Sequence, residues 1–219
     1  MKEKQNTKLS LILERVSYHA VYDKSILDAL EYAHQNGFAG IQLAVETPHL
    51  SFESLSVKQL NKITSFIEKH GTYISIHAPD EVTSLFQHSQ YLLQGVQDYF
   101  GALFDFAAQV KTRIITLHLG VMISYKTDTT PVIRIPAEDL KIYKSNLVRN
   151  LNRLLEIANN RFVLCVENEG LDNCGLSVLQ NYLDKNKLAL CWDLAKNWNN
   201  PVTEEFFLKN LPGKVKEIV

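Results

Sequence analysis

The chain has 219 residues, of which 46% are hydrophobic and 21% are charged, and its formal net charge is −1. This composition is typical of a globular protein with enough length for one sizeable core. The near-zero net charge provides no overall field that would favour nucleic acid or an anionic membrane surface. The apolar run at residues 9–13 stops at Glu14, so it is too short for a signal peptide, and no later stretch is suited to spanning a bilayer.

The cysteines indicate a reducing environment. There are three of them, an odd number without the paired spacing of a metal site or a disulfide framework. Cys165 and Cys191 lie inside apolar runs, where a cysteine usually serves as a small buried residue. We therefore expect a cytoplasmic location.

Short apolar runs alternate with segments of helical period along the chain. The runs are rich in Ile, Val and Leu, which is typical of strands buried on both faces of a parallel sheet. Ser56 and Gln59 form a capping-box pattern at the start of one helix, and Gly71 provides a stop signal at its end. In chain order we predict a strand at 9–13, a helix at 25–35, a strand at 40–45, a helix at 56–71, a strand at 73–77, a helix at 91–110, a strand at 113–118, a loop at 120–136, a helix at 136–158, a strand at 162–167, a helix at 176–183, a strand at 188–193, a helix at 203–211 and the start of a seventh strand at 214–219.

This alternation predicts an α/β protein, a TIM-type barrel formed by one domain over residues 1–219. Six strand–helix units and the start of a seventh strand do not close an eight-stranded barrel, which typically needs about 250 residues. The barrel is therefore expected to be incomplete. An open sheet leaves edge strands unpaired, so self-association into a homo-oligomer is also expected.

Four potential ligands each stand at the carboxyl end of a predicted strand: His77, His118, Glu167 and Asp193. In a parallel barrel these ends open on one face, which carries the chemistry. Two imidazoles and two carboxylates that converge there would suit a divalent ion such as Zn, Mn, Co or Mg. Glu167 is the strongest candidate, because a carboxylate directly after an apolar strand would be costly to bury without a partner.

Each candidate also has a structural interpretation. Glu167 could form an ion pair at the barrel rim, and Asp193 could cap the turn that follows its strand. His77 and His118 could be rim histidines that contact no ligand. The hypothesis of a metal site depends on all four sharing one face.

A second group of residues could contact a substrate at the same face. Glu46 follows the second predicted strand, and Asn168 follows Glu167, where it and Glu169 could orient the ligand. Lys196 could contact a hydroxyl or phosphate, although a solvated loop lysine is the simpler interpretation. Trp198 could line a sugar pocket.

The motifs HAP, HLG, VENEG and CWDLAKN stand at four successive strand ends, and in this order they resemble the xylose isomerase-like superfamily. That group contains sugar-phosphate isomerases and epimerases and the endonuclease IV-type nucleases, all metal-dependent barrels. The resemblance runs from about residue 9 to 219 and implies metal-binding roles for Glu167 and Asp193; in the nuclease branch it also implies them for His77 and His118. Many members have a His where this chain has Lys196, and their remaining ligands would fall beyond Val219.

The resemblance implies a sugar or sugar-phosphate isomerase or epimerase that transfers a proton next to a carbonyl, with a divalent metal and Glu167 as one of two catalytic carboxylates. The alternative is an endonuclease IV-like zinc phosphodiesterase, which explains the His pair better. Nucleic acid is nevertheless an unexpected partner at this net charge. A third possibility is a non-catalytic barrel remnant. A small-molecule sugar is therefore the expected substrate.

Overall fold

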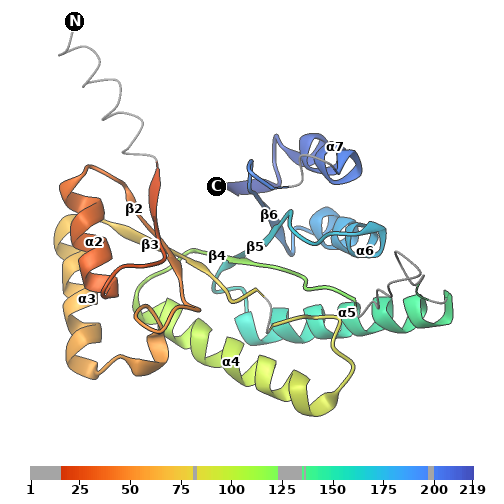
Figure 1. Cartoon of the computed structure of the whole chain (residues 1–219), viewed down its shortest axis with the longest axis horizontal. Helices are drawn as coiled ribbons and strands as arrows, with labels where there is room; N and C mark the ends of the chain where they lie inside the picture. The colour runs from red at the N-terminus through yellow and green to blue at the C-terminus, as the bar shows by residue number, and fades with distance from the viewer. Residues whose placement is uncertain (1–15, 81–82, 123–134, 136, 197–199) are drawn as a thin grey trace, which may run out of the picture. The chain divides into compact units, whose positions relative to one another are not determined.

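The computed structural model describes residues 16–80, 83–122, 135, 137–196 and 200–219. Strands and helices alternate along the chain from β1 to β7 (Figure 1), and the strand pairings with an assigned register are parallel. The elements are β1 (Ser17–Ala20), α2 (Ile26–Gln35), β2 (Gly40–Ala44), the 3₁₀ helix η1 (Phe52–Ser54), α3 (Val57–His70), β3 (Tyr73–His77), α4 (Gln90–Gln109), β4 (Ile114–Leu117), α5 (Ala137–Ala158), β5 (Val163–Glu167), α6 (Asn173–Asp184), β6 (Ala189–Trp192), α7 (Pro201–Asn210) and β7 (Val215–Ile218).

The packing of the backbone divides the chain into two compact units. The first comprises the described part of Met1–Pro79 together with Leu103–Ile115, and the second comprises Asp80–Ala102 and Thr116–Val219. The boundary falls inside α4 and inside β4, so each of these elements contributes residues to both units. The single domain expected over residues 1–219 stays a prediction.

In the first unit, β1, β2 and β3 are parallel neighbours, and α2 packs against β1, β2 and α3 (Figure 1). Ile41 and Leu43 on β2 have no exposed surface. The predicted capping box is confirmed at the start of α3: the Ser56 hydroxyl accepts from the Gln59 amide at 3.3 Å, and the Ser56 amide donates to Gln59 Oε1 at 2.9 Å. Gly71 ends α3 in the left-handed conformation, as expected from the sequence.

One face of the β1–β3 sheet carries polar side chains. Ser17, Gly40 and Tyr73 lie in register across the three strands, and Ser17 Oγ donates to Tyr73 Oη at 2.9 Å. Gln42 lies two residues beyond Gly40 and therefore shares this face. It is 2% exposed, and neither atom of its side-chain amide has a hydrogen-bond partner among the described residues. This amide is a local cost to the stability of the first unit.

In the second unit, β5, β6 and β7 are parallel neighbours, with α6 packed against α5. The Trp192 and Phe207 rings lie 6.3 Å apart, so Trp192 packs against α7. Cys165 and Cys191 are buried and free, which confirms their interpretation as small core residues. Burial also raises the pKa of both thiols well above the usual range, so neither is a reactive thiolate.

The structure shows a strand near the start of the described chain that the sequence did not predict. The strand expected at residues 9–13 lies outside the described residues, and the first strand observed is β1, Ser17–Ala20. His19 is part of this strand. The prediction missed β1 because the sequence SYHA has no apolar run. The strand is partly exposed, so it does not need an apolar run.

Other boundaries differ by a few residues. α6 begins at Asn173 rather than 176, because the Asp172 carboxylate accepts from the Gly175 amide at 2.8 Å and caps the first turn. Most of the long loop expected at 120–136 lies outside the described residues. The described residues form six strand–helix units and a seventh strand, one strand fewer than a closed TIM barrel has. Among the helices of the described chain, none combines the length and apolarity needed to cross a membrane.

Candidate metal centre and active site

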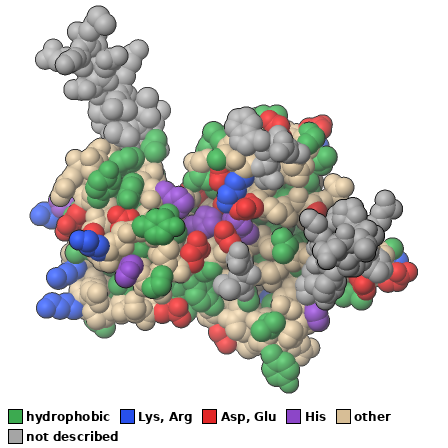
Figure 2. Space-filling view, in the orientation of Figure 1, with side chains coloured by type: hydrophobic (Ala, Val, Ile, Leu, Met, Phe, Trp, Pro, Cys, Tyr) green, Lys and Arg blue, Asp and Glu red, His purple; other side chains and the backbone are tan. Residues whose placement is uncertain are grey.

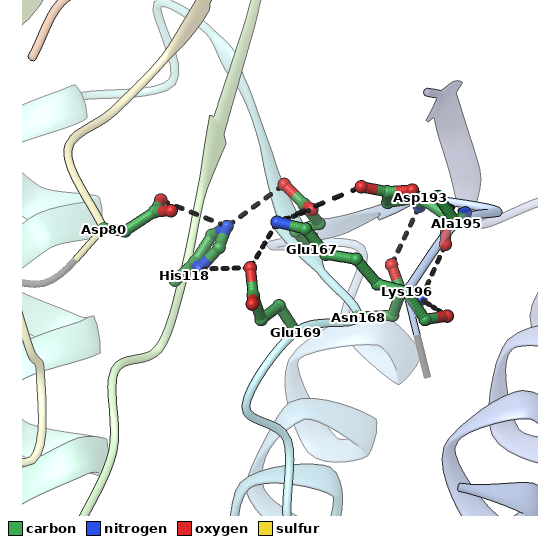
Figure 3. Close-up of polar contacts among 8 residues, drawn as sticks. All are labelled: Asp80, His118, Glu167, Asn168, Glu169, Asp193, Ala195 and Lys196. Carbon is green, nitrogen blue, oxygen red and sulfur yellow. Dashed lines mark hydrogen bonds and ion pairs between the residues drawn. The ribbon is translucent and has the colours of Figure 1, made fainter. Parts of the chain in front are cut away.

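The carboxyl ends of β4, β5 and β6 place a group of charged side chains together in the second unit. His118 directly follows β4, Glu167 is the last residue of β5, and Asp193 directly follows β6. Asp80 joins them from the segment after β3, and Lys196 joins them from the turn after β6 (Figure 3). We refer to Asp80, His118, Glu167, Glu169, Asp193 and Lys196 as the strand-end cluster.

The imidazole of His118 lies among three carboxylates. Its Nε2 atom is 3.1 Å from Glu167 Oε2 and 3.2 Å from Asp80 Oδ1, and its Nδ1 atom is 3.8 Å from Glu169 Oε2 (Figure 3). His118 is 7% exposed and Glu167 is 1% exposed, so water does little to screen these groups. Since one ring nitrogen carries at most one proton, Nε2 cannot donate a full hydrogen bond to both carboxylates at once.

Lys196 lies on the other side of Glu167. Its Nζ atom is 3.1 Å from Glu167 Oε1, forms a close ion pair with Glu169, and is 3.9 Å from Asp193 Oδ2. Partial burial opposes the charge on Lys196, but the hydrogen bond to Glu169 and the nearby charge of Glu167 outweigh it and raise its pKa well above the usual range. Lys196 therefore contacts three carboxylates of the cluster, rather than being only a solvated loop lysine.

Asn168 connects the loop after β5 to the loop after β6. Its Oδ1 atom accepts from the Asp193 amide at 2.8 Å, and its Nδ2 atom donates to the Asp193 carbonyl at 2.9 Å and to the Lys196 carbonyl at 3.4 Å (Figure 3). The side chain is 2% exposed. Asn168 therefore fixes the backbone that carries Asp193 and Lys196, while its predicted contact with a substrate stays a prediction.

The tight exit of the chain after His118 depends on Gly120. This residue has a φ of +80°, and a Cβ atom added to it would lie 2.4 Å from Ser84 Oγ and 2.5 Å from Ser84 Cα. The Leu119 carbonyl accepts from the Leu85 amide at 2.9 Å, so this strand end is joined to the segment at 83–86. The HLG motif thus holds the backbone next to His118 close to the segment that follows Asp80.

The cluster fits a divalent cation. Ligand atoms of Asp80, His118 and Glu169 all lie within 4.8 Å of one another. Four carboxylates face a single lysine within the cluster, so negative charge is in excess even if His118 is protonated. A cation between the imidazole and the carboxylates would also remove the competition for one proton on Nε2.

The structure brings together five of the residues predicted for the site: His118, Glu167, Asn168, Asp193 and Lys196. Asp193 also caps its turn, since its Oδ1 atom accepts from the Ala195 amide at 2.7 Å. This bond supports the capping interpretation of Asp193, and its role as a ligand stays a prediction.

Three further predicted residues are not among the described residues of the second unit. His77 is the buried last residue of β3, and Glu46 is an exposed residue after β2; both belong to the first unit. Trp198 lies outside the described residues. The roles of these three residues stay predictions.

Sequence reasoning missed Asp80 as a site residue. The only signal was its position three residues after His77 in the sequence HAPD, directly after Pro79. It also gave Glu169 only an orienting role, although Glu169 contacts both His118 and Lys196. Neither contact could be inferred from spacing, because the partners are far apart in the chain.

The sequence profile of the xylose isomerase-like TIM barrels matches residues 30–209, so the chain belongs to this family. Among solved structures, a D-psicose 3-epimerase with D-fructose present is 14% identical, with a TM-score of 0.68 over 92% of this chain and 71% of that one. The 3-keto-D-glucoside 4-epimerase of E. coli is 13% identical, with a TM-score of 0.66 over 92% and 76%. Endonuclease IV of Thermus thermophilus is 17% identical, with a TM-score of 0.65 over 92% and 74%.

These similarities confirm the predicted family and fold. At such low identity they establish the architecture and not the reaction. Sugar epimerases and a nuclease both occur among the structural neighbours, so the isomerase interpretation and the nuclease alternative both fit the family. No curated protein matches the chain.

Proposed function

We propose that the protein is a metal-dependent sugar or sugar-phosphate isomerase or epimerase. The observation that carries this proposal is the position of Glu167: a buried carboxylate whose two oxygens face His118 Nε2 and Lys196 Nζ, each at 3.1 Å. A catalytic acid or base must be held in a fixed orientation toward the carbon that gains or loses the proton. The two contacts restrain the carboxylate of Glu167 in this way.

The other cluster residues would hold the ion and the substrate. Ligand atoms of Asp80, His118 and Glu169 lie within 4.8 Å of one another, so these residues would hold a divalent metal, with His77, Glu167 and Asp193 as further predicted ligands. The bound ion would supply a Lewis acid that polarises the sugar carbonyl. Glu167 would then accept a proton next to that carbonyl and return it.

The proposed partner is a small-molecule sugar, with Glu46, Asn168, Lys196 and Trp198 as its predicted contacts. A cytoplasmic location is proposed because the cysteines are free. Self-association also stays a prediction, which light scattering at several protein concentrations would test.

The direct test is the substitution Glu167→Gln, which keeps the shape of the side chain and removes its capacity to accept a proton. We expect loss of epimerisation, measured as exchange of the transferred hydrogen with deuterium from solvent, by roughly a hundredfold or more. Glu156→Gln is the matched control, because Glu156 is an exposed glutamate paired with Arg153 at 3.0 Å on α5. Equal exchange rates in Glu167→Gln and the parent enzyme, across a panel of ketoses and their phosphates, would contradict the proposal.

An endonuclease IV-like activity is the second candidate. The similarity to a solved endonuclease IV supports it, as does a group of basic side chains over α3 that the sequence did not reveal (Figure 2). Lys58, Lys62 and Lys69 line a groove between α2 and α3. Cleavage of DNA containing an abasic site, with Zn²⁺ present and no epimerisation of any sugar, would favour the nuclease. A metal-binding protein with neither activity would support a non-catalytic remnant.

A further inference from the structure

Lys196 differs from its surroundings in charge, since it is the one cation in the strand-end cluster. Its Nζ atom lies within ion-pair distance of Glu167 at the end of β5, and of Glu169 and Asp193 in the segments after β5 and β6. An ammonium that contacts three carboxylates occupies the kind of position that a bound cation would take. The short pair with Glu169 and the 3.1 Å contact with Glu167 show that these two carboxylates already have a positive partner.

A divalent ion and the lysine therefore compete for the same oxygens. Glu169 contributes a ligand atom to the group with Asp80 and His118, and it is also the closest partner of Lys196. An ion bound there would lie close to the ammonium, and two positive charges at such a separation repel each other strongly where solvent screening is reduced. The Lys196 side chain is 33% exposed, so part of this repulsion remains screened.

We propose that Lys196 is a built-in cation that weakens metal binding and restricts the cluster to a single divalent ion on its Asp80–His118 side. This inference rests on the proposed metal-dependent function and specifies it further. The ammonium neutralises part of the charge of Glu167, Glu169 and Asp193, and so removes the electrostatic drive for a second ion next to Asp193. A site built in this way differs from a multinuclear zinc centre of the kind a nuclease mechanism requires.

The consequence for the substrate follows from the same charges. With one ion and one lysine among four carboxylates, the cluster keeps an excess of negative charge. The described residues of the cluster therefore favour an uncharged, hydroxyl-rich sugar at the metal, with any phosphate directed away from it.

The test is metal binding by the folded protein, measured by isothermal titration calorimetry with Mn²⁺ and Zn²⁺ and by metal content after gel filtration. Lys196→Met removes the charge and keeps the length of the side chain, and Lys196→Gln is a second uncharged variant in case the first does not fold. Lys196→Arg retains the charge. Lys111→Met is the matched control, because Lys111 pairs with a carboxylate, Glu68, at 2.7 Å on an exposed surface of the first unit.

We expect one ion per chain in the parent protein and roughly tenfold or tighter binding, or a second ion, in the uncharged variants. Lys196→Arg and Lys111→Met should bind as the parent does. The inference is overturned if the parent binds one ion and the uncharged variants bind no tighter, a result that leaves the proposed function intact. If neither the parent nor the uncharged variants bind an ion, the proposed metal-dependent function fails as well. Two or three tightly bound zinc ions in the parent would also overturn the inference and would support the nuclease.

Discussion

Substitution of Asn168 tests whether this side chain holds the loop that carries Asp193 and Lys196. Asn168→Ala removes two short hydrogen bonds to the backbone of Asp193, at 2.8 and 2.9 Å, and a longer one at 3.4 Å to Lys196. At a net value of about 1 kcal/mol for each short bond, with a further penalty for a poorly hydrated amide, the free energy of unfolding should fall by about 2–3 kcal/mol. The 2% exposure of Asn168 limits replacement of these bonds by water.

Asn168→Asp separates the bond that the Asn168 side chain accepts from the bonds that it donates. It keeps an acceptor for the Asp193 amide, but it loses both donors and places a carboxylate against carbonyl oxygens and beside Glu167 and Glu169. We expect Asn168→Asp to be at least as destabilising as Asn168→Ala. We also expect Asn168→Ala to bind a divalent ion more weakly than the parent protein, because the loop after β6 is no longer fixed.

The assay is urea denaturation followed by circular dichroism and by tryptophan fluorescence, because Trp192 adjoins the affected loop. Asn181→Ala is the control: the Asn181 side chain makes one exposed bond to the Ser177 carbonyl within α6, so its change should stay within about 0.5 kcal/mol. A stability of Asn168→Ala within about 0.5 kcal/mol of the parent protein would refute the assigned role.

Three further substitutions test other parts of the structure. Gln42→Leu should raise the free energy of unfolding by about 1 kcal/mol in denaturant titration, because it removes a buried amide with no protein partner among the described residues; a loss would show that the amide is satisfied by bound water or a ligand. Gly120→Ala should cost about 2 kcal/mol or more, since it adds a Cβ atom 2.4 Å from Ser84 Oγ at a φ of +80°, and wild-type thermal stability would contradict this. Desolvation and the neighbouring His34 lower the pKa of His70 below 6.5, so its neutral form contributes stability above pH 6.5 that is lost as the pH falls through the lowered value. The melting temperature should therefore fall less on acidification in His70→Gln than in the parent, and parallel pH profiles would contradict the assignment.

The parts of the fold that sequence predicted well depend on local interactions. The box of Ser56 and Gln59 involves residues three apart, and apolar runs that are buried on both faces identify β2, β3, β5 and β6 because burial requires such composition. β1 was missed for the converse reason. This strand is only four residues long, mostly polar and partly exposed, so neither its length nor its hydrophobicity distinguishes it from a loop.

The sequence by itself determined the family, the alternation of strands and helices, and the presence of His118, Glu167 and Asp193 at strand ends. Parallel strands place their carboxyl ends on one side of the sheet, so residues at these ends can be predicted to share that side. Only the tertiary structure showed that Asp80 contacts His118 and that Lys196 lies between Glu167 and Glu169. These contacts join residues 27 to 38 positions apart. The physical reason is that a charge contact depends on distances of a few ångströms between side chains, and the packing of successive strands and loops sets those distances, whereas spacing along the chain does not.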